Sequence, residues 1–223
     1  MPTENFLSPT WYIDSETPEI KEAVKECTTG LTADREKAVA IFYYVRDKIK
    51  YNPYLISPEK KTFIASVILK YGEGYCVQKA ILYAAMARAA GIPCRLGFAI
   101  VKNHLTTPRL RELLGSDIFV FHGYNSILIE NKWIKATPTF DIKLCEKFGV
   151  VPLDFDGLSD AIFHEFDKSG RKHMEYLHDY GTFEDLPYDL MISEVKKHYP
   201  DFYKAFIKGN LKISGDFINE VKA

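Results

Sequence analysis

The fold of this chain is decided by the stretch 71–80, which reads Tyr71-Gly72-Glu73-Gly74-Tyr75-Cys76-Val77-Gln78-Lys79-Ala80. Two glycines loosen the backbone immediately before the cysteine. After Cys76, apolar residues recur at the spacing of one buried helical face. Gly91 is suited to a left-handed helix end, and Pro93 prevents continuation. The stretch therefore predicts a helix from Cys76 to about Gly91, and its buried face consists of Val77, Ala80, Ile81, Ala84 and Ala85.

Cys76 would lie in the first turn of this helix, and two interpretations of it remain open. In the first, the unpaired N–H groups and the positive end of the helix dipole stabilise a thiolate. They would then lower the thiol pKa from its free value of about 8.5, which makes a nucleophile. In the second, Cys76 is a small buried apolar residue, which is the usual environment of a free cysteine.

The composition is that of an ordinary globular protein. The chain has 223 residues, of which 47% are hydrophobic and 26% charged, and this length is enough for a large core. The formal net charge of -1 gives no reason to expect a nucleic-acid or membrane-surface partner. No apolar run approaches the length of a membrane span, and the first residues lack the pattern of a secretion signal.

The four cysteines are widely spaced, and no Cys-x-x-Cys pair is present. This spacing argues against a zinc site and against a disulfide scaffold. We therefore expect a cytoplasmic protein with reduced thiols, and neither a metal ion nor an organic cofactor is implied. The oligomeric state is unknown from sequence.

Helices precede strands along the chain. Residues 33–49 have the period of an amphipathic helix with Thr32 as its N-cap, and 62–70 form a shorter helix. From Cys94 the period changes from 3.6 to 2. Strands are expected at 94–101, at 118–130 and from Trp133, with a helical turn at 108–114 between the first two. This order indicates an α+β fold in which helices pack on an antiparallel β-meander.

The remainder, 142–223, is predicted to be a mostly helical extension with helices at 187–199 and 200–208. The mixed aromatic and acidic stretch 154–188 is interpreted as a cap over part of a cleft. Because no linker or repeat interrupts the sequence, we expect a single domain over 1–223.

A cysteine nucleophile needs a base, usually histidine, and that histidine needs a third group to orient it. Of the six histidines, only His122 lies in a strand of the sheet against which the cysteine helix must pack. Phe121 precedes it and Gly123 follows it, so little steric bulk lies beside the imidazole. The alternative is a core histidine with one hydrogen bond.

Two blocks of sequence resemble the transglutaminase-like superfamily. The first is 74–80 followed by 86–95, with the pattern Gly-x-Cys-x-x-x-Ala and then Ala-Arg-Ala-x-Gly-Ile-Pro-x-Arg. The second is His122 followed by Trp133 and Pro138-Thr139. The resemblance covers about 33–141. It implies a papain-like α+β core in which Cys76 at a helix start faces His122 on the sheet. The family includes crosslinking acyltransferases, peptidases, deglycosylating amidases and proteins that have lost catalysis.

One position departs from this family pattern. Thr137 stands where the family has the aspartate that orients the histidine. A threonine hydroxyl can hydrogen-bond an imidazole, but it cannot offset an imidazolium charge as a carboxylate does. If Asn131-Lys132 is a two-residue hairpin loop, Glu130 faces Trp133, Ser126 faces Thr137 and His122 faces Asp141. Asp141 could then take the orienting role, or it could simply cap the turn after the strand.

Other polar residues are assigned structural roles. The backbone N–H of Cys76 is a natural oxyanion donor. Tyr71, Tyr75 and Gln78 are near in sequence but are expected to be structural. A metal-binding interpretation of the 164–179 region is disfavoured because its spacing matches no ligand pattern; the residues concerned are His164, Glu165, Asp167, His173, Glu175, His178 and Asp179.

The sequence thus favours a cysteine-dependent acyl-transfer or amide-hydrolysing enzyme. Cys76 attacks an amide carbonyl of a protein or peptide substrate, His122 carries the proton, and Asp141 or Thr137 steadies the imidazole. Hydrolysis is preferred over transfer to an amine. The alternative is a non-catalytic protein- or peptide-binding module that retains the papain-like core.

Overall fold

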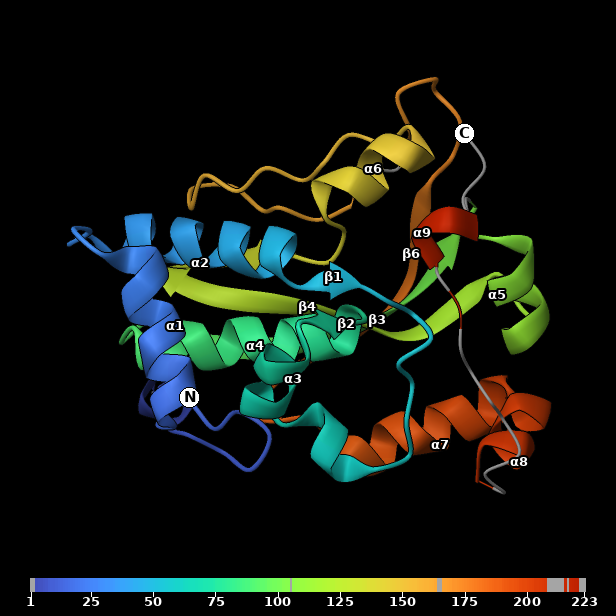
Figure 1. Cartoon of the computed structure of the whole chain (residues 1–223), viewed down its shortest axis with the longest axis horizontal. Helices are drawn as coiled ribbons and strands as arrows, with labels where there is room; N and C mark the ends of the chain where they lie inside the picture. Colours follow the sequence, from blue (N-terminus) through green and yellow to red (C-terminus); the bar gives the residue numbers. More distant parts are fainter. Residues whose placement is uncertain (1–2, 105, 164–165, 208–214, 216, 221–223) are drawn as a thin grey trace.

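The computed structural model describes residues 3–104, 106–163, 166–207, 215 and 217–220. Among these residues, helices and a four-stranded sheet enclose one long buried helix (Figure 1). The elements before the sheet are η1 (Thr3–Phe6), α1 (Pro18–Thr28), α2 (Asp34–Lys48), β1 (Lys50–Tyr51), η2 (Lys60–Phe63), α3 (Ala65–Tyr71), β2 (Glu73–Gly74) and α4 (Cys76–Ala89).

The sheet and the C-terminal helices follow. The elements are β3 (Cys94–Asn103), α5 (Pro108–Leu114), β4 (Ile118–Ile129), β5 (Lys132–Ala136), α6 (Ile142–Phe148), β6 (Met174–Phe183), α7 (Tyr188–His198), α8 (Pro200–Ile207) and α9 (Phe217–Glu220). The α+β class, the helix at 33–49 and the helix starting at Cys76 are confirmed, although α2 begins after Ala33 rather than after a Thr32 cap.

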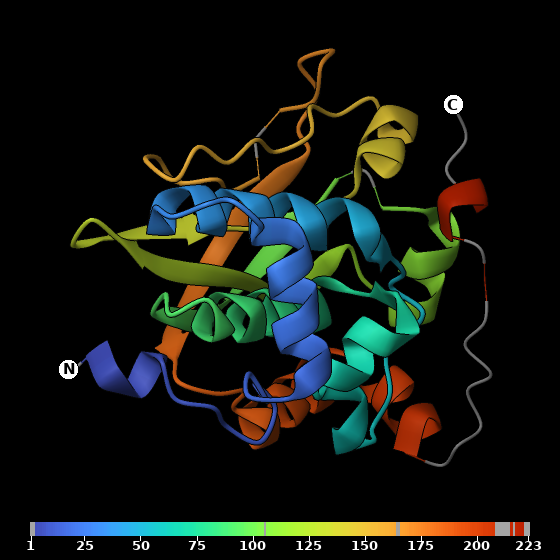
Figure 2. The ribbon, with the colours of Figure 1, turned by 60° about the vertical axis from the view of Figure 1, so that its left-hand side comes forward.

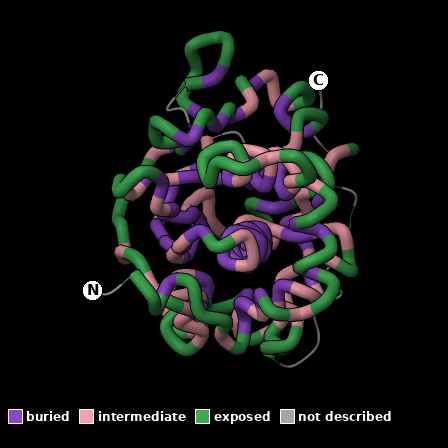
Figure 3. The backbone as a smooth tube through the Cα atoms, turned by 90° about the vertical axis from the view of Figure 1, so that its left-hand side faces the viewer, coloured by how far each residue is buried: buried purple, intermediate pink, exposed green. Residues whose placement is uncertain are grey.

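Helix α4 is the centre of the molecule. Every residue from Val77 to Arg88 is buried, so the helix has no solvent face. It contacts α1, α2 and α3 on one side and strands β3 and β4 on the other. Figure 3, which looks along this helix, shows it enclosed by the rest of the chain. A helix that is apolar all round must be covered on all sides, and its alanines let the neighbouring backbones come close.

The sheet has the order β5-β4-β3-β6, and all its pairs are antiparallel. Strands β3, β4 and β5 form the expected meander. Strand β6 was not predicted: it lies within 154–188, which was interpreted as a cap, and it pairs with the free edge of β3. Figure 2 shows the orange β6 beside the green strands. The C-terminal extension therefore contributes a strand to the sheet as well as helices.

The predicted hairpin loop was wrong by two positions in register. Ile129 pairs with Lys132 and Ser126 with Lys135, so the loop is Glu130-Asn131 and not Asn131-Lys132. Glu130 and Asn131 have φ values of 49° and 64°. A two-residue loop with positive φ at both positions is the type I′ turn that suits the twist of a hairpin, and asparagine adopts this conformation readily.

Within the described residues, no helix has both the length and the apolar character needed to cross a membrane.

Candidate active site

Short pieces of backbone bring Cys76 to the start of α4. Gly72 adopts a φ of 70° and ends α3 in the left-handed conformation. The next two residues pair with β1 as a parallel ladder, in which Tyr51 lies opposite Gly74. Tyr75 then precedes the helix in an extended conformation, and its N–H donates to the Gln78 side chain over 3.2 Å. The cysteine is thus the first helical residue, as predicted.

Strand β4 meets the start of α4 at Gly123. A Cβ atom built on Gly123 would lie 3.0 Å from the carbonyl oxygen of Cys76 and 3.0 Å from Cα of Val77. Only a glycine allows backbone to approach backbone this closely. The preceding residue on the strand is His122, so the contact also brings the histidine's backbone to the cysteine.

A distortion of β4 lies directly before this contact. The pairing of β3 with β4 shifts register between Ala99 and Val101, and Phe121 has a φ of 58°. Positive φ is strained for a bulky residue, and such bulges re-aim side chains near functional sites. Here the bulge sets the direction in which His122 leaves the strand.

The environment of the thiol differs from the expected one. Burial raises the pKa of Cys76 to about 11, and the backbone N–H groups of Gly123, Val77 and Cys76 itself oppose this increase only in part. Of the two interpretations that the sequence leaves open, the raised pKa does not favour the activated thiolate. The helix start supplies the predicted N–H groups, but removal of water from the sulfur outweighs them.

His122 is also buried and neutral. Burial, with the nearby His173 as a smaller contribution, lowers the pKa of His122 to about 4. Its Nε2 atom has no hydrogen-bond partner among the described residues. Its ring centroid lies 5.3 Å from that of Phe163 and 6.5 Å from that of Tyr176. The imidazole therefore lies among aromatic rings.

Thr137 and Tyr176 lie on the histidine's side of the site. Thr137 is 1% exposed, and its hydroxyl has no hydrogen bond of good geometry within the described chain. Burial raises the pKa of the Tyr176 hydroxyl to about 12. The neighbouring N–H of Phe163 and hydroxyl of Thr137 lower this pKa in part, and the charge of a Cys76 thiolate would raise it further. Tyr176 thus links the surroundings of Cys76, His122 and Thr137.

Asp141 lies at the start of α6 and is its N-cap. One carboxylate oxygen accepts from the N–H of Leu144 over 3.0 Å, and the other accepts from the N–H of Tyr51 over 3.4 Å. The ladder between β4 and β5 ends at Asn125 and Ala136, so the predicted pairing of His122 with Asp141 does not form. The turn-capping alternative describes the observed bonds of Asp141.

Lys79 fastens the first turns of α4 to α2. Its ammonium group donates to the carbonyl oxygens of Arg46 and Ile49, at the C-terminal end of α2. A cation is favourable at such an end, where carbonyls lack helical partners. Nevertheless, burial lowers the pKa of Lys79 to about 7, against the opposing influence of Asp141 and Asp47.

The residues near Cys76 that were expected to be structural occupy different places. Both ends of the Gln78 amide are used, since it accepts from the Tyr75 N–H and donates to the Thr62 carbonyl over 2.9 Å. The ring of Tyr71 is 71% exposed. Only Tyr75 reaches the space beside the thiol, where it lines a cavity.

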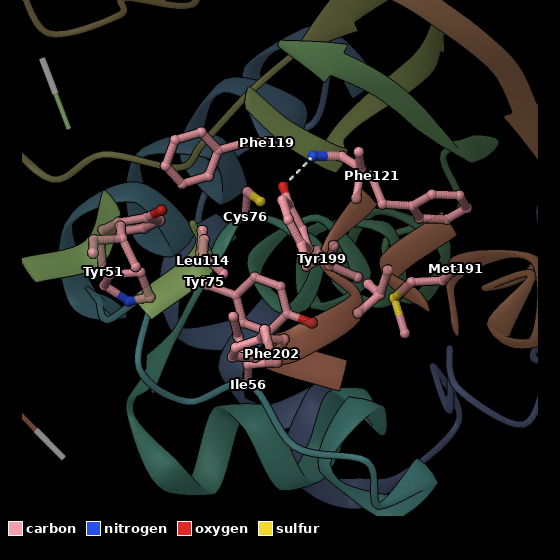
Figure 4. Close-up of a pocket in the computed structure, with 15 residues that line it drawn as sticks. Tyr51, Ile56, Tyr75, Cys76, Leu114, Phe119, Phe121, Met191, Tyr199 and Phe202 are labelled. Atoms are coloured by element: carbon pink, nitrogen blue, oxygen red, sulfur yellow. Dashed lines mark hydrogen bonds between the residues drawn. The ribbon is translucent and has the colours of Figure 1, made fainter. Parts of the chain in front are cut away.

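That cavity opens beside Cys76 and is nearly all apolar (Figure 4). It encloses about 590 Å³, its open mouth included. Leu110 and Leu114 of α5, Phe119 of β4 and Met191 of α7 form parts of its wall. Among the described residues, no charged side chain lines it. The route to the sulfur on this side therefore passes along apolar and aromatic surface.

Tyr199, between α7 and α8, closes one side of the cavity. Its hydroxyl accepts from the N–H of Val120 over 2.9 Å, the dashed line in Figure 4, and donates to the carbonyl of Ile118 over 2.6 Å. Burial raises the pKa of this hydroxyl, and the charge of a Cys76 thiolate would add to the increase.

No metal centre is found in the part of the chain that the structure describes, because no three His, Cys, Asp or Glu side chains there gather as ligands would. Two of the residues in the disfavoured metal-binding interpretation, His164 and Glu165, lie outside the described residues.

The sequence did not reveal three residues of the site: Tyr176, His173 and Tyr199. All three come from the extension, more than 50 positions after His122. A strand pattern in 174–183 would have been the signal for Tyr176, but β6 has one buried residue and carries no apolar alternation. For Tyr199, sequence offers only its place beside Pro200 between two helices.

Comparison with solved structures finds two weak likenesses. The structure is similar to a "putative cysteine protease" from Cytophaga hutchinsonii, with 17% identity and a TM-score of 0.48 over 81% of this chain and 54% of that chain. It is also similar to a "putative protease" from Parabacteroides distasonis, with 16% identity and a TM-score of 0.41 over 60% of this chain and 26% of that chain. This chain thus spans about half of the first protein's length and a quarter of the second's, and at these TM-scores neither likeness carries weight for activity. Among curated proteins, none matches the chain.

The sequence model of one family matches residues 21–138, which is more than half of the 223 residues and contains α4, the Gly123 contact and Thr137. The chain belongs to the transglutaminase-like superfamily.

Proposed function

We propose that this chain is a cysteine-dependent enzyme that acts on the amide bond of a protein or peptide. The observation that carries the proposal is the position of the Cys76 thiol: it lies at the start of a helix and beside a cavity, with the backbone of His122-Gly123 against it. Membership of the transglutaminase-like superfamily supports the same class of chemistry.

In the proposed reaction, the sulfur of Cys76 attacks the amide carbonyl while His122 takes the thiol proton. The C–N bond then breaks, and the amine leaves with the proton that His122 returns. A thioester remains on Cys76. Water cleaves this thioester in a hydrolase and an amine cleaves it in a transglutaminase; we propose hydrolysis.

The uncharged state of Cys76 and His122 bears on when the thiol proton is transferred. With the pKa of Cys76 raised to about 11 and that of His122 lowered to about 4, both groups are uncharged at neutral pH. We therefore propose that the proton transfers during the attack and not before it, because no stable ion pair is present at rest. The N–H of Cys76 is the proposed donor to the oxyanion.

For the third role we propose Thr137 in preference to Asp141. The Thr137 hydroxyl is buried without a partner among the described residues, and the Tyr176 hydroxyl lies next to it. Both carboxylate oxygens of Asp141 already accept backbone N–H groups. A threonine can hold an imidazole in one tautomer, but it cannot stabilise an imidazolium, which fits a histidine that is neutral at rest.

The test is hydrolysis of a panel of peptide p-nitroanilides by the purified chain and its variants. Cys76→Ala should abolish release of nitroaniline, and His122→Ala should reduce kcat by about 10²–10⁴. Cys27→Ser on α1 and His104→Ala are the matched controls, since both lie outside the site, and they should leave the rate unchanged. Activity that survives Cys76→Ala would refute the proposal.

A non-catalytic peptide-binding module is the second candidate. The half-buried thiol with its raised pKa and the absence of a carboxylate bound to His122 within the described residues favour it. Peptides that bind the wild type and Cys76→Ala with equal Kd, with no turnover by either, would establish this alternative.

A further inference from the structure

The edge of β4 beside Cys76 is unusual. Strand β5 pairs with β4 only from Asn125 to Ile129, so the segment 118–122 has no strand on that side within the part of the chain that the structure describes. Its outward backbone groups are the carbonyl of Ile118 and the N–H of Val120. An unpaired edge of this kind is a template for an extended chain.

Tyr199 satisfies both groups with a single hydroxyl. It accepts from the N–H of Val120 and donates to the carbonyl of Ile118. These are the two groups that a neighbouring strand would engage with its own carbonyl and N–H. The tyrosine hydroxyl therefore occupies the position of a peptide backbone, within a few residues of His122.

The cavity lies along the same edge. Phe119 and Phe121 of β4 line it, as do Val195, Tyr199 and Phe202 of the α7–α8 pair, and Cys76 is reached through it. An extended chain on this edge would place alternate side chains to one side, toward the cavity. Since no charged side chain of the described residues lines the cavity, an apolar side chain is the kind that fits it.

We propose that the site takes an extended peptide whose backbone replaces the Tyr199 hydroxyl on residues 118–120 and whose apolar side chain fills the cavity next to Cys76. This inference rests on the proposed function for its reacting group and adds the substrate class. The α7–α8 pair then both covers the strand edge, through Tyr199, and forms one wall of the specificity pocket.

The polar backbone groups at the edge of β4 favour a peptide over a fatty acyl chain. A hydrocarbon needs only the apolar walls, whereas the N–H of Val120 and the carbonyl of Ile118 can pair only with a polar backbone. A long-chain alkyl group would leave both groups without partners once Tyr199 moved, and buried unpaired backbone groups are costly.

Alkylation of Cys76 tests the inference without any need for turnover. The probes are N-acetyl dipeptide chloromethyl ketones that end in Leu, Phe, Ala, Asp or Lys, with iodoacetamide and N-octyl iodoacetamide as references. The sulfur displaces chloride, and the thiol proton goes to the buffer. Labelling at Cys76 is followed by peptide-mapping mass spectrometry, which yields kinact/KI.

We expect the Leu and Phe ketones to react 10- to 100-fold faster than the Asp and Lys ketones, with saturation. Tyr199→Phe keeps the ring but frees the edge, so it should lower KI for the Leu ketone about 5-fold. Val195→Trp should fill the cavity and remove the preference. Leu190→Trp, on the same helix but outside the lining, should retain it, and matching circular dichroism spectra verify folding.

Equal rates for apolar and charged ketones would overturn the inference, as would N-octyl iodoacetamide labelling faster than every ketone with no effect of Tyr199→Phe. The proposed function fails separately: selective, saturable labelling with no hydrolysis of the matching peptide anilides would support the peptide site and refute the enzyme. Hydrolysis without apolar preference would do the reverse.

Discussion

The reactivity of Cys76 in the free protein follows from the raised pKa of its thiol. With a pKa of about 11, the thiolate fraction at pH 7 is about 10⁻⁴, against about 3 × 10⁻² for a free cysteine of pKa 8.5. Because only the thiolate reacts with iodoacetamide, ionisation alone should make Cys76 about 300-fold slower than a free cysteine. The rate should rise tenfold per pH unit up to about pH 11.

Cys27 offers an internal reference for this measurement. It is half-buried on α1, and burial raises the pKa of its thiol to about 11 as well. Labelling of both cysteines in one sample, resolved by mass spectrometry, should therefore give parallel pH profiles. His122→Ala should not change the shape of the Cys76 profile above pH 5, since the pKa of His122 is lowered to about 4 and the imidazole is already neutral there.

A plateau of fast labelling at Cys76 between pH 5 and pH 9, lost in His122→Ala and absent at Cys27, would refute this reasoning. It would mean that the free protein holds a thiolate–imidazolium pair and that burial does not dominate at the sulfur.

Three further predictions concern the supports of the site. Lys79 has a pKa of about 7 in the folded state and 10.5 in the unfolded state, so the unfolded state binds more protons between these two pH values. The free energy of unfolding of the wild type, relative to that of Lys79→Met, should therefore rise by roughly 4 kcal/mol from pH 7 to pH 10.5. Urea titrations at several pH values measure this difference. Gly123→Ala should cost about 1–3 kcal/mol and lower kcat, because its Cβ meets backbone at 3.0 Å, whereas Ser126→Ala on the same strand should leave kcat unchanged. Asp141→Ala should lower the free energy of unfolding by about 1 kcal/mol, because the helix cap is lost, and Asp141→Asn should lower it by less. The kcat of Asp141→Asn should stay within a few-fold of the wild-type value. A large loss of kcat in Asp141→Asn would instead show that the carboxylate orients His122.

The parts of the fold that sequence predicted are those fixed by local pattern. The helix from Cys76 carries its own start and stop signals, and the period of 2 after Cys94 marks the strands. Strand β6 could not be found this way: it is an edge strand with mostly exposed residues, and only its pairing with β3 holds it in the sheet. The hairpin register failed because Asn131 was placed at the wrong position of a two-residue loop.

In the candidate site, too, the features fixed by local sequence were predicted and those fixed by tertiary contacts were not. Cys76 and His122 were chosen because each lies in a recognisable block, and the structure brings their backbones together at Gly123. Sequence left two interpretations of Cys76 open, a lowered thiol pKa or a buried apolar residue, because the helix start is visible in sequence and the covering is not. Tyr51, Tyr75, Tyr176 and Tyr199, whose pKa values the charge of a Cys76 thiolate would raise, come from four separate elements or loops, and sequence does not show that they meet at the sulfur.

The apolar lining of the cavity and the raised pKa of the Cys76 thiol have a common cause. The cavity is apolar and Tyr199 holds the strand edge, and the same closure that makes the pocket selective also removes water from the thiol and the imidazole. An open pocket would rehydrate the sulfur and leave the N–H groups at the start of α4 as the dominant influence, which would lower the pKa of Cys76. Release of Tyr199 from Val120 with no peptide in the cavity, as in Tyr199→Phe, should therefore give a more acidic Cys76 thiol than that of the wild type. Faster iodoacetamide labelling of Cys76 in Tyr199→Phe than in the wild type is thus the expected behaviour of a site that Tyr199 covers, and a permanently open site would not show it.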